Sequence, residues 1–178
     1  MNSKFEKLSE LDAGEFEHLN GSLIKHLNST YQLLVKWGAS QELSDSGLYH
    51  AAYGTAGFET QVVSLSQRSD IEKIIGKAAE EIVYLYCSCD RDFVFKNFDV
   101  STSIKFRDRF TKKEFELTQE QAHQFCELIV ANELELAIDN SDFLMEHGQG
   151  LLKFFSRMKP LLSKQANDTV KSVLGSVT

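Results

Sequence analysis

The stretch SLIKHLNSTYQLLVKWG, residues 22–38, indicates the fold class because its apolar residues recur at the helical period. The apolar positions are Leu23, Leu27, Tyr31, Leu34 and Val35. Ser22 is suited to cap the start of a helix, and Gly38 is suited to end it. The pattern therefore predicts a helix from about Ser22 to Trp37.

The same reasoning predicts helices along most of the chain, since there is one Pro and many strong helix formers. We expect a second helix over about Gln41–Tyr53, and buried positions in the helix that begins with KAAEEIVYLY. Further helices are expected at 69–76, at about Gln119–Ile138, and in one or two pieces after residue 141. Pro160 should kink or end one of the last pieces.

Two capping boxes are predicted, one from Ser69 to Glu72 and one from Thr118 to Gln121. The period changes in STSIKFRDRFTKKEFELT, where apolar and polar residues alternate around a polar turn. This alternation predicts a β-hairpin at about residues 101–117. The expected fold is therefore all-α with a small hairpin insertion. Residues 1–20 are interpreted as a capping segment and residues 21–178 as a single domain.

Composition narrows the classes of partner. The 178 residues carry a net charge of -7, which argues against nucleic acid and anionic membrane surfaces as partners. No apolar run approaches membrane-spanning length, and the first 20 residues are polar and acidic, unlike a signal peptide. The three Cys are sparse and lack the spacing of a zinc site, which fits reduced thiols. We therefore expect a cytoplasmic protein.

Three residues on separate helices are the candidate metal ligands: His26, His50 and Asp90. No local motif such as HExxH occurs, so a metal site would have to be assembled from different helices. Two imidazoles and one carboxylate suit Fe, Mn or Zn, with positions left for water or substrate. Each residue also has a simpler interpretation: the histidines as hydrogen-bonded core residues, and Asp90 as a helix end with a surface ion pair.

The segments SLIKHLNSTYQLL, SGLYHAAYGT and IVYLYCSCDR resemble the helical HD superfamily of metal-dependent phosphohydrolases and related oxygenases. The resemblance implies an HD-like helical bundle in which His26 and His50 match two metal-binding histidines and Asp90 matches the last Asp. Ala51 departs from the pattern, because the superfamily has a metal-binding Asp after the second His. A two-metal site is therefore not expected here.

A closer resemblance, over about residues 18–135, is to an uncharacterised bacterial family of small HD-like proteins. The matching motifs occur in order, from His18 and Trp37-Gly38 through Tyr53-Gly54-Thr55 to Asp90-Arg91. That family also lacks the Asp of the His-Asp pair, and it brings no established activity.

Several polar residues near these motifs are candidates for binding or catalysis. Tyr53, Thr55 and His18 are interpreted as substrate-binding groups, with structural turn hydroxyls as the alternative for the first two. Arg68 and Arg91 could hold a carboxylate or phosphate, or could form salt bridges instead.

Three further polar residues are candidates for the site: Glu80, Asn132 and Glu133. Glu80 is a candidate base or a partner for a ligating His, and a solvent-facing Glu is the alternative. Asn132 and Glu133 are expected to face the same cavity, although an amphipathic core helix also explains their segment.

Two functions remain open from the sequence. One is a metal-dependent enzyme, of hydrolase or oxygenase type, that acts on a small anionic molecule with one divalent ion (Fe, Mn or Zn). The alternative is a non-catalytic HD-like domain that binds a small molecule or a protein, and Ala51 favours it. A homodimer is the expected assembly only because symmetric dimers are the commonest.

Overall fold

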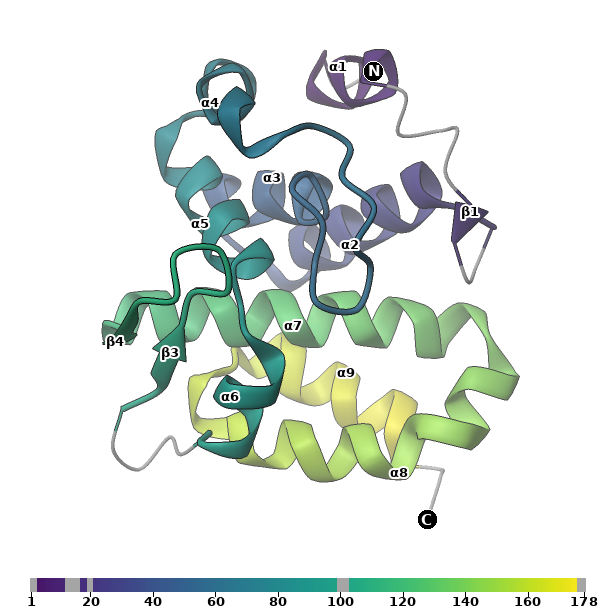
Figure 1. Ribbon diagram of the computed structural model, residues 1–178. Helices are drawn as coiled ribbons and strands as arrows, with labels where there is room; N and C mark the ends of the chain where they lie inside the picture. Colours follow the sequence, from purple (N-terminus) through teal and green to yellow (C-terminus); the bar gives the residue numbers. More distant parts are fainter. Residues whose placement is uncertain (1–2, 12–16, 19–20, 99–102, 176–178) are drawn as a thin grey trace.

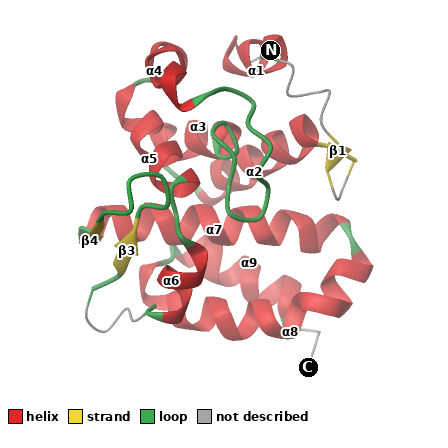
Figure 2. Ribbon diagram, viewed as in Figure 1, coloured by secondary structure: helices red, strands yellow, loops and turns green. Residues whose placement is uncertain are grey.

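The structure is a computed structural model of the chain, described for residues 3–11, 17–18, 21–98 and 103–175. Most of these residues are helical, and the strands are few and short (Figure 2). The prediction of an all-α fold with a small hairpin is confirmed. No helix in the described part of the chain is both long and apolar enough to cross a membrane.

One helical layer is built from α2 (Leu23–Trp37), α3 (Gln41–Tyr49) and α5 (Lys77–Cys87), which pack on one another. Two shorter helices, α1 (Ser3–Glu10) and α4 (Arg68–Ile75), cover the outer side of this layer (Figure 1). The helix α1 is anchored there by Leu8, which is fully buried.

The long helix α7 (Gln119–Asp139) separates this layer from a second layer, which consists of α8 (Ser141–Met158) and α9 (Lys164–Leu174). One side of α7 contacts α2, α3 and α5, and the other contacts α8 and α9 (Figure 1). A short 3₁₀ turn, Lys159–Leu161, contains Pro160 and ends α8 as predicted. Because α7 is enclosed by both layers, its polar residues Glu127, Asn132 and Glu135 are held in the interior.

The hairpin consists of β3 (Lys105–Arg107) and β4 (Glu114–Glu116), paired antiparallel with Phe106 opposite Phe115. It is shorter than the predicted 101–117, and residues 101–102 lie outside the described residues. Beside β3 lies the short helix α6 (Arg91–Lys96). A second antiparallel pair joins β1 (Glu17–His18) to β2 (Gly21–Ser22).

The predicted ends of α2 are confirmed. The Ser22 side chain accepts a hydrogen bond from the Lys25 N–H, and Gly38 takes the left-handed conformation with φ 76°. Most of the predicted apolar stripe faces the interior, with Leu23, Leu27 and Leu34 fully buried.

The predicted extent of α3 is wrong, because the helix ends at Tyr49 instead of Tyr53. The backbone leaves the helix in tight turns, with the Ala52 N–H donating to Tyr49 O at 2.9 Å. Gly54 completes the turn at φ 69°, where a Cβ would meet Glu59 O at 2.8 Å. His50 therefore lies at the end of α3, where the chain turns into the 51–58 loop.

One of the two predicted capping boxes is confirmed, from Thr118 to Gln121 at the start of α7. The box predicted at Ser69 is wrong, because Ser69 lies inside α4. The helical stretch begins about one turn earlier, with the 3₁₀ turn Leu65–Gln67, and the Gln67 side chain accepts the Ser64 N–H at 3.0 Å. The sequence SLSQ offers the same cap pattern as the predicted one, so the earlier start prevails.

Candidate functional site

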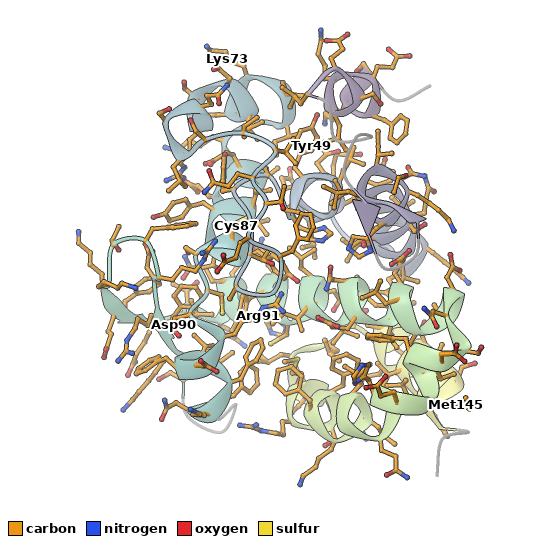
Figure 3. The ribbon with its side chains drawn as sticks, turned by 45° about the vertical axis from the view of Figure 1, so that its right-hand side comes forward. Tyr49, Lys73, Cys87, Asp90, Arg91 and Met145 are labelled. Atoms are coloured by element: carbon orange, nitrogen blue, oxygen red, sulfur yellow. The ribbon has the colours of Figure 1, made fainter. Side chains whose placement is uncertain are left out.

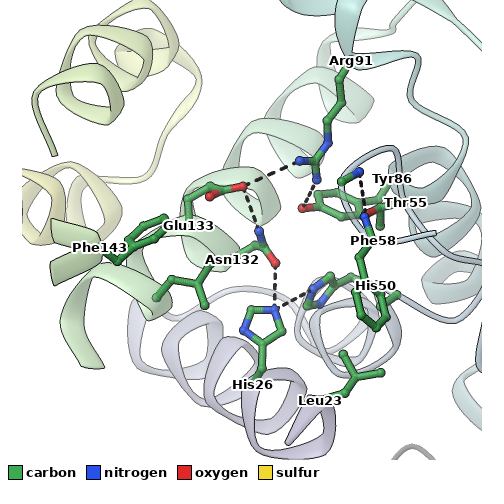
Figure 4. A pocket seen from close by; sticks show the side chains of 13 residues that line it. Leu23, His26, His50, Thr55, Phe58, Tyr86, Arg91, Asn132, Glu133 and Phe143 are labelled. Atoms are coloured by element: carbon green, nitrogen blue, oxygen red, sulfur yellow. Dashed lines mark hydrogen bonds and ion pairs between the residues drawn. The ribbon is translucent and has the colours of Figure 1, made fainter. Parts of the chain in front are cut away.

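A cavity of about 170 Å³ lies where α2, the end of α3, α7 and the 51–58 loop meet. Figure 4 shows its polar side chains, which come from segments far apart in the sequence. They are His26, His50, Thr55, Arg91, Asn132 and Glu133. The apolar part of the wall includes Leu23, Ala51, Phe58, Tyr86, Leu136 and Phe143.

The two imidazoles of this cavity are in direct contact. His26 Nε2 lies 3.2 Å from His50 Nε2, and both residues are 2% exposed. Gly47 makes this approach of α2 and α3 possible, because a Cβ there would lie 2.5 Å from Leu34 Cδ1. Gly47 therefore allows the histidines of the two helices to come into contact.

The Nδ1 atom of each ring faces an acceptor. His50 Nδ1 lies 2.7 Å from Gly47 O, and His26 Nδ1 lies 2.6 Å from Glu135 Oε2. A backbone carbonyl can only accept, so His50 carries its proton on Nδ1. A carboxylate at Glu135 assigns the His26 proton to Nδ1 in the same way. In the neutral rings, each Nε2 is then an acceptor.

Asn132 adds a third acceptor to this meeting point. Its Oδ1 lies 3.0 Å from His26 Nε2, and its Nδ2 donates to Glu133 Oε1 at 3.1 Å. The bond to a carboxylate fixes the orientation of the amide, because a carboxylate cannot donate. His26 Nε2 thus lies beside two acceptor atoms, His50 Nε2 and Asn132 Oδ1, and a positive charge at this point, a proton or a metal ion, removes the repulsion between their lone pairs.

Arg91 lies at the other end of the same chain of contacts, which Figure 4 traces through Asn132 and Glu133. Its guanidinium lies 4.0 Å from Glu133 and donates to the Tyr86 hydroxyl at 3.3 Å. Burial alone would lower the pKa of Arg91, but the nearby Tyr86 and Glu133 raise it by more. The cavity therefore carries a permanent positive charge beside its imidazoles.

Asp90 lies elsewhere, although it precedes Arg91 in the chain. Its carboxylate caps α6 by accepting the Phe93 N–H at 3.2 Å, and it lies 3.8 Å from Arg107 on β3. In Figure 3 Asp90 and Arg91 diverge, with Asp90 toward the hairpin. Asp90 does not line the cavity, and among the described residues no group of three His, Cys, Asp or Glu side chains could hold a metal ion.

Three other predicted site residues form a separate cluster, which we name the Arg68 cluster: Arg68, Glu80 and Tyr53. Arg68 binds Glu80 bidentately, with both N–H···O distances at 2.7 Å, and the Tyr53 hydroxyl donates to the same carboxylate at 2.7 Å. Glu80 is 2% exposed, and none of the three lines the cavity. Glu80, the predicted base, and Arg68, a predicted anion-binding residue, therefore bind each other outside the cavity.

The remaining positions singled out in the sequence are Thr55, Ala51 and His18. Thr55 lines the cavity, but its hydroxyl accepts the Phe58 N–H at 3.1 Å and so orders the 51–58 loop. Ala51 also lines the cavity, so no carboxylate is available at that position. His18 lies in β1, and its side chain is outside the described residues.

The cysteines do not act as nucleophiles at neutral pH. All three are free and buried, and burial raises the pKa of Cys87 and Cys89 to about 12. Cys87 Sγ donates to His50 O at 3.1 Å, which holds the backbone at the end of α3. The thiol next to the candidate site is therefore a structural contact.

Sequence reasoning missed Glu135, the buried partner of His26. The signal was present in ANELELA, where three polar residues interrupt a helix that is otherwise apolar on this side. Asn132 and Glu135 both contact His26 of α2, and Glu133 is bonded to Asn132. Among the described residues, Glu135 Oε1 is buried without a hydrogen-bond partner.

Part of the chain is similar to a known protein family. Residues 7–91 match a family described as a domain of unknown function (DUF6817). The matched segment is less than half of the chain; it includes His26, His50 and Arg91 but ends before Asn132 and Glu133. The searches of curated proteins and of solved structures found no match.

Proposed function

We propose that this protein is a metal-dependent enzyme of hydrolase type that acts on a small anionic molecule in the His26–His50 cavity. The observation that carries the proposal is the pairing of the two Nε2 atoms, 3.2 Å apart, while each Nδ1 faces an acceptor. Metal-binding histidines usually donate their other ring N–H to a carboxylate or a backbone carbonyl, as these two do.

The donor set fits one divalent ion. Two ligand atoms that each lie about 2.0–2.2 Å from a metal are separated by roughly 3.0–3.4 Å at ordinary coordination angles. The distances from His26 Nε2 to His50 Nε2 and to Asn132 Oδ1 are 3.2 Å and 3.0 Å. We therefore assign His26, His50 and Asn132 as the ligands and replace the predicted Asp90 by Asn132. Fe, Mn and Zn remain the candidate ions.

Arg91 provides the binding site for the anionic substrate. Arg68 is committed to a bidentate bond with Glu80, whereas the carboxylate nearest Arg91 is 4.0 Å away. A guanidinium in this position can bind two oxygens of a phosphate or carboxylate. Of the two arginines predicted to bind an anion, Arg91 lines the cavity and Arg68 does not.

The chemistry that follows is hydrolysis. A divalent ion held by His26, His50 and Asn132 would lower the pKa of a water molecule and supply a nucleophile at neutral pH. Glu133 is the general base, because its carboxylate contacts Asn132 at 3.1 Å and lines the cavity beside Arg91. An oxygenase is less favoured, because non-haem iron oxygenases use two histidines and a carboxylate as protein ligands.

The alternative is a non-catalytic domain that binds a small molecule through the same cavity. Ala51 supports this alternative, because it lines the cavity at the position where the HD pattern has a metal-binding Asp. In that case a proton on one imidazole relieves the conflict between the acceptors. The resemblance to HD proteins is compatible with both functions.

Elemental analysis of tag-free protein tests the metal. We expect about one equivalent of Fe, Mn or Zn, lost in His50→Ala and reduced at least tenfold in Asn132→Ala. Metal-free protein whose melting temperature does not change on adding Mn²⁺, Fe²⁺ or Zn²⁺ would contradict the proposal and leave the non-catalytic alternative.

Asp90→Ala is the matched control, since it removes the carboxylate that the sequence predicted as a ligand. We expect it to retain the metal and to lose about 1 kcal/mol of stability with the cap of α6. Loss of the metal in Asp90→Ala would show that the assignment to Asn132 is wrong.

A further inference from the structure

A second cavity, of about 270 Å³, adjoins the His26–His50 cavity. The two share Tyr86, Arg91 and Glu133 as lining residues. The guanidinium of Arg91 therefore stands at the boundary between them, and a molecule held by Arg91 reaches both.

The second cavity has a different character from the first. Beyond the shared residues its wall is mostly apolar, formed by Phe95 of α6, Ile129 of α7, and Leu151 and Phe154 of α8. The rings of Phe95 and Phe154 are in contact, with centroids 4.7 Å apart. The wall thus combines aromatic and aliphatic side chains from three helices.

The other arginine of this cavity is not placed to bind an anion. Arg157 donates to the backbone carbonyls of Phe95 and Phe98. These bonds hold α8 against the end of α6 and occupy the guanidinium edge. The anion-binding group of the second cavity is therefore the shared Arg91, and the space beyond it suits an uncharged group.

We infer that the substrate is a small organic anion that carries an apolar group, and that this group occupies the second cavity. The inference rests on the proposed function, because it takes Arg91 as the site of the anionic group. A cavity of about 150 Å³ with apolar walls is large enough for benzene, so 270 Å³ accommodates an aromatic ring or a branched alkyl group. An inorganic anion has no apolar group and would make no contact with the apolar walls of the second cavity.

Matched pairs of anions test the inference by calorimetry on the protein as purified. Phenylphosphonate and methylphosphonate carry the same anionic group and resist hydrolysis; benzoate and acetate repeat the comparison for a carboxylate. We expect the phenyl or benzoyl member to bind roughly ten- to hundredfold more tightly, because it buries its ring.

Two tryptophan variants on α8 locate the effect. Leu151→Trp fills the second cavity and should reduce the preference for the aromatic member to about twofold or less. Leu152→Trp is the control, because Leu152 is half-buried on the same helix and does not line the cavity. It should keep the full preference.

The outcomes separate this inference from the proposed function. Equal affinities of the two members, with both lost in Arg91→Met, would overturn the inference and keep Arg91 as the anion site. An aromatic preference that survives in Leu151→Trp would place the ring elsewhere and also overturn it. If none of the four anions binds, the proposed function fails together with the inference.

Discussion

Two clusters of polar side chains in this protein differ in how their donors and acceptors are matched. In the Arg68 cluster the Glu80 carboxylate receives three hydrogen bonds from charged or hydroxyl donors, all at 2.7 Å. In the cavity, His26 Nε2 faces the two acceptors His50 Nε2 and Asn132 Oδ1. In the first cluster donors meet an acceptor, whereas in the second one imidazole nitrogen lies beside two acceptor atoms.

From this difference we infer that the Arg68 cluster is structural and that the His26–His50 cavity binds a ligand. A buried polar network in which every donor has an acceptor stabilises one conformation and leaves no group for a ligand. A set of acceptor atoms that converge on one point beside a cavity is the kind of arrangement that suits a cation. The difference predicts that substitutions in the Arg68 cluster reduce stability, and that substitutions in the cavity mainly change binding.

The largest effect is expected for Arg68→Met, which leaves the Glu80 carboxylate buried without its cation. Breaking a buried ion pair by removing one partner costs about 3–5 kcal/mol. The Arg68 side chain is 37% exposed, so solvent screens part of this cost and we expect a loss of about 2–3 kcal/mol. Urea unfolding measures the loss, with the metal content unchanged. A change of metal content with little loss of stability would contradict the separation of the two clusters.

A smaller loss is expected for Tyr53→Phe, which removes one hydrogen bond to Glu80. At pH 7 the variant should be about 1–2 kcal/mol less stable. Burial, and then the bond to Glu80, raise the pKa of Tyr53 above its usual value of 10.0. The stabilisation is therefore present below pH 10 and is lost as the pH rises further, because the unfolded chain then releases the proton first.

Comparing wild type with Tyr53→Phe at pH 7 and above pH 10 isolates this effect. Other buried tyrosines, such as Tyr49 and Tyr86, weaken both proteins in alkali and cancel in the difference. We expect the difference between the two unfolding free energies to shrink above pH 10. A difference that grows with pH would show that the hydroxyl is not held as a neutral donor.

The sequence was sufficient to predict the elements with strong local signals. Apolar periodicity and cap residues located α2 and the start of α7, because these signals depend only on neighbouring residues. The end of α3 was missed because it depends on a tertiary contact, the pairing of Ala52 O with the Val62 and Val63 N–H groups.

The site was only partly predictable for the same reason. His26 and His50 were identified from local motifs, and they do meet in the cavity. Whether a polar residue satisfies a neighbour or faces a cavity depends on which helix packs against it, and this information is not local. Glu80 and Asp90 were therefore assigned to the wrong surroundings, and the partner Glu135, 109 residues from His26, was missed.

The substitution Asn132→Asp would make the His26–His50 cavity more like a conventional metal site. An anionic ligand binds a divalent ion more strongly than a neutral amide oxygen, so we expect Mn²⁺ affinity to rise about tenfold, or 1.4 kcal/mol. Asn140→Asp is the control, because it adds the same charge at the cap of α8 outside the cavity. Unchanged Mn²⁺ affinity in Asn132→Asp would indicate a proton at this point instead of a metal ion.

The smallest effect is expected for Gly57→Ala, which tests the position of Arg91 without touching its charge. A Cβ at Gly57 would lie 3.0 Å from Arg91 Nη1, close enough to displace the end of a flexible side chain but not the backbone. Phenylphosphonate should bind about threefold more weakly, while the unfolding free energy changes by less than about 0.5 kcal/mol. Ala56→Ser is the neighbouring control, since Ala56 is exposed and does not line the cavity. If Gly57→Ala and Ala56→Ser bind phenylphosphonate equally well, displacement of the guanidinium does not affect binding. A bidentate bond from Arg91 to the anion would then be excluded, because such a bond requires a fixed guanidinium plane.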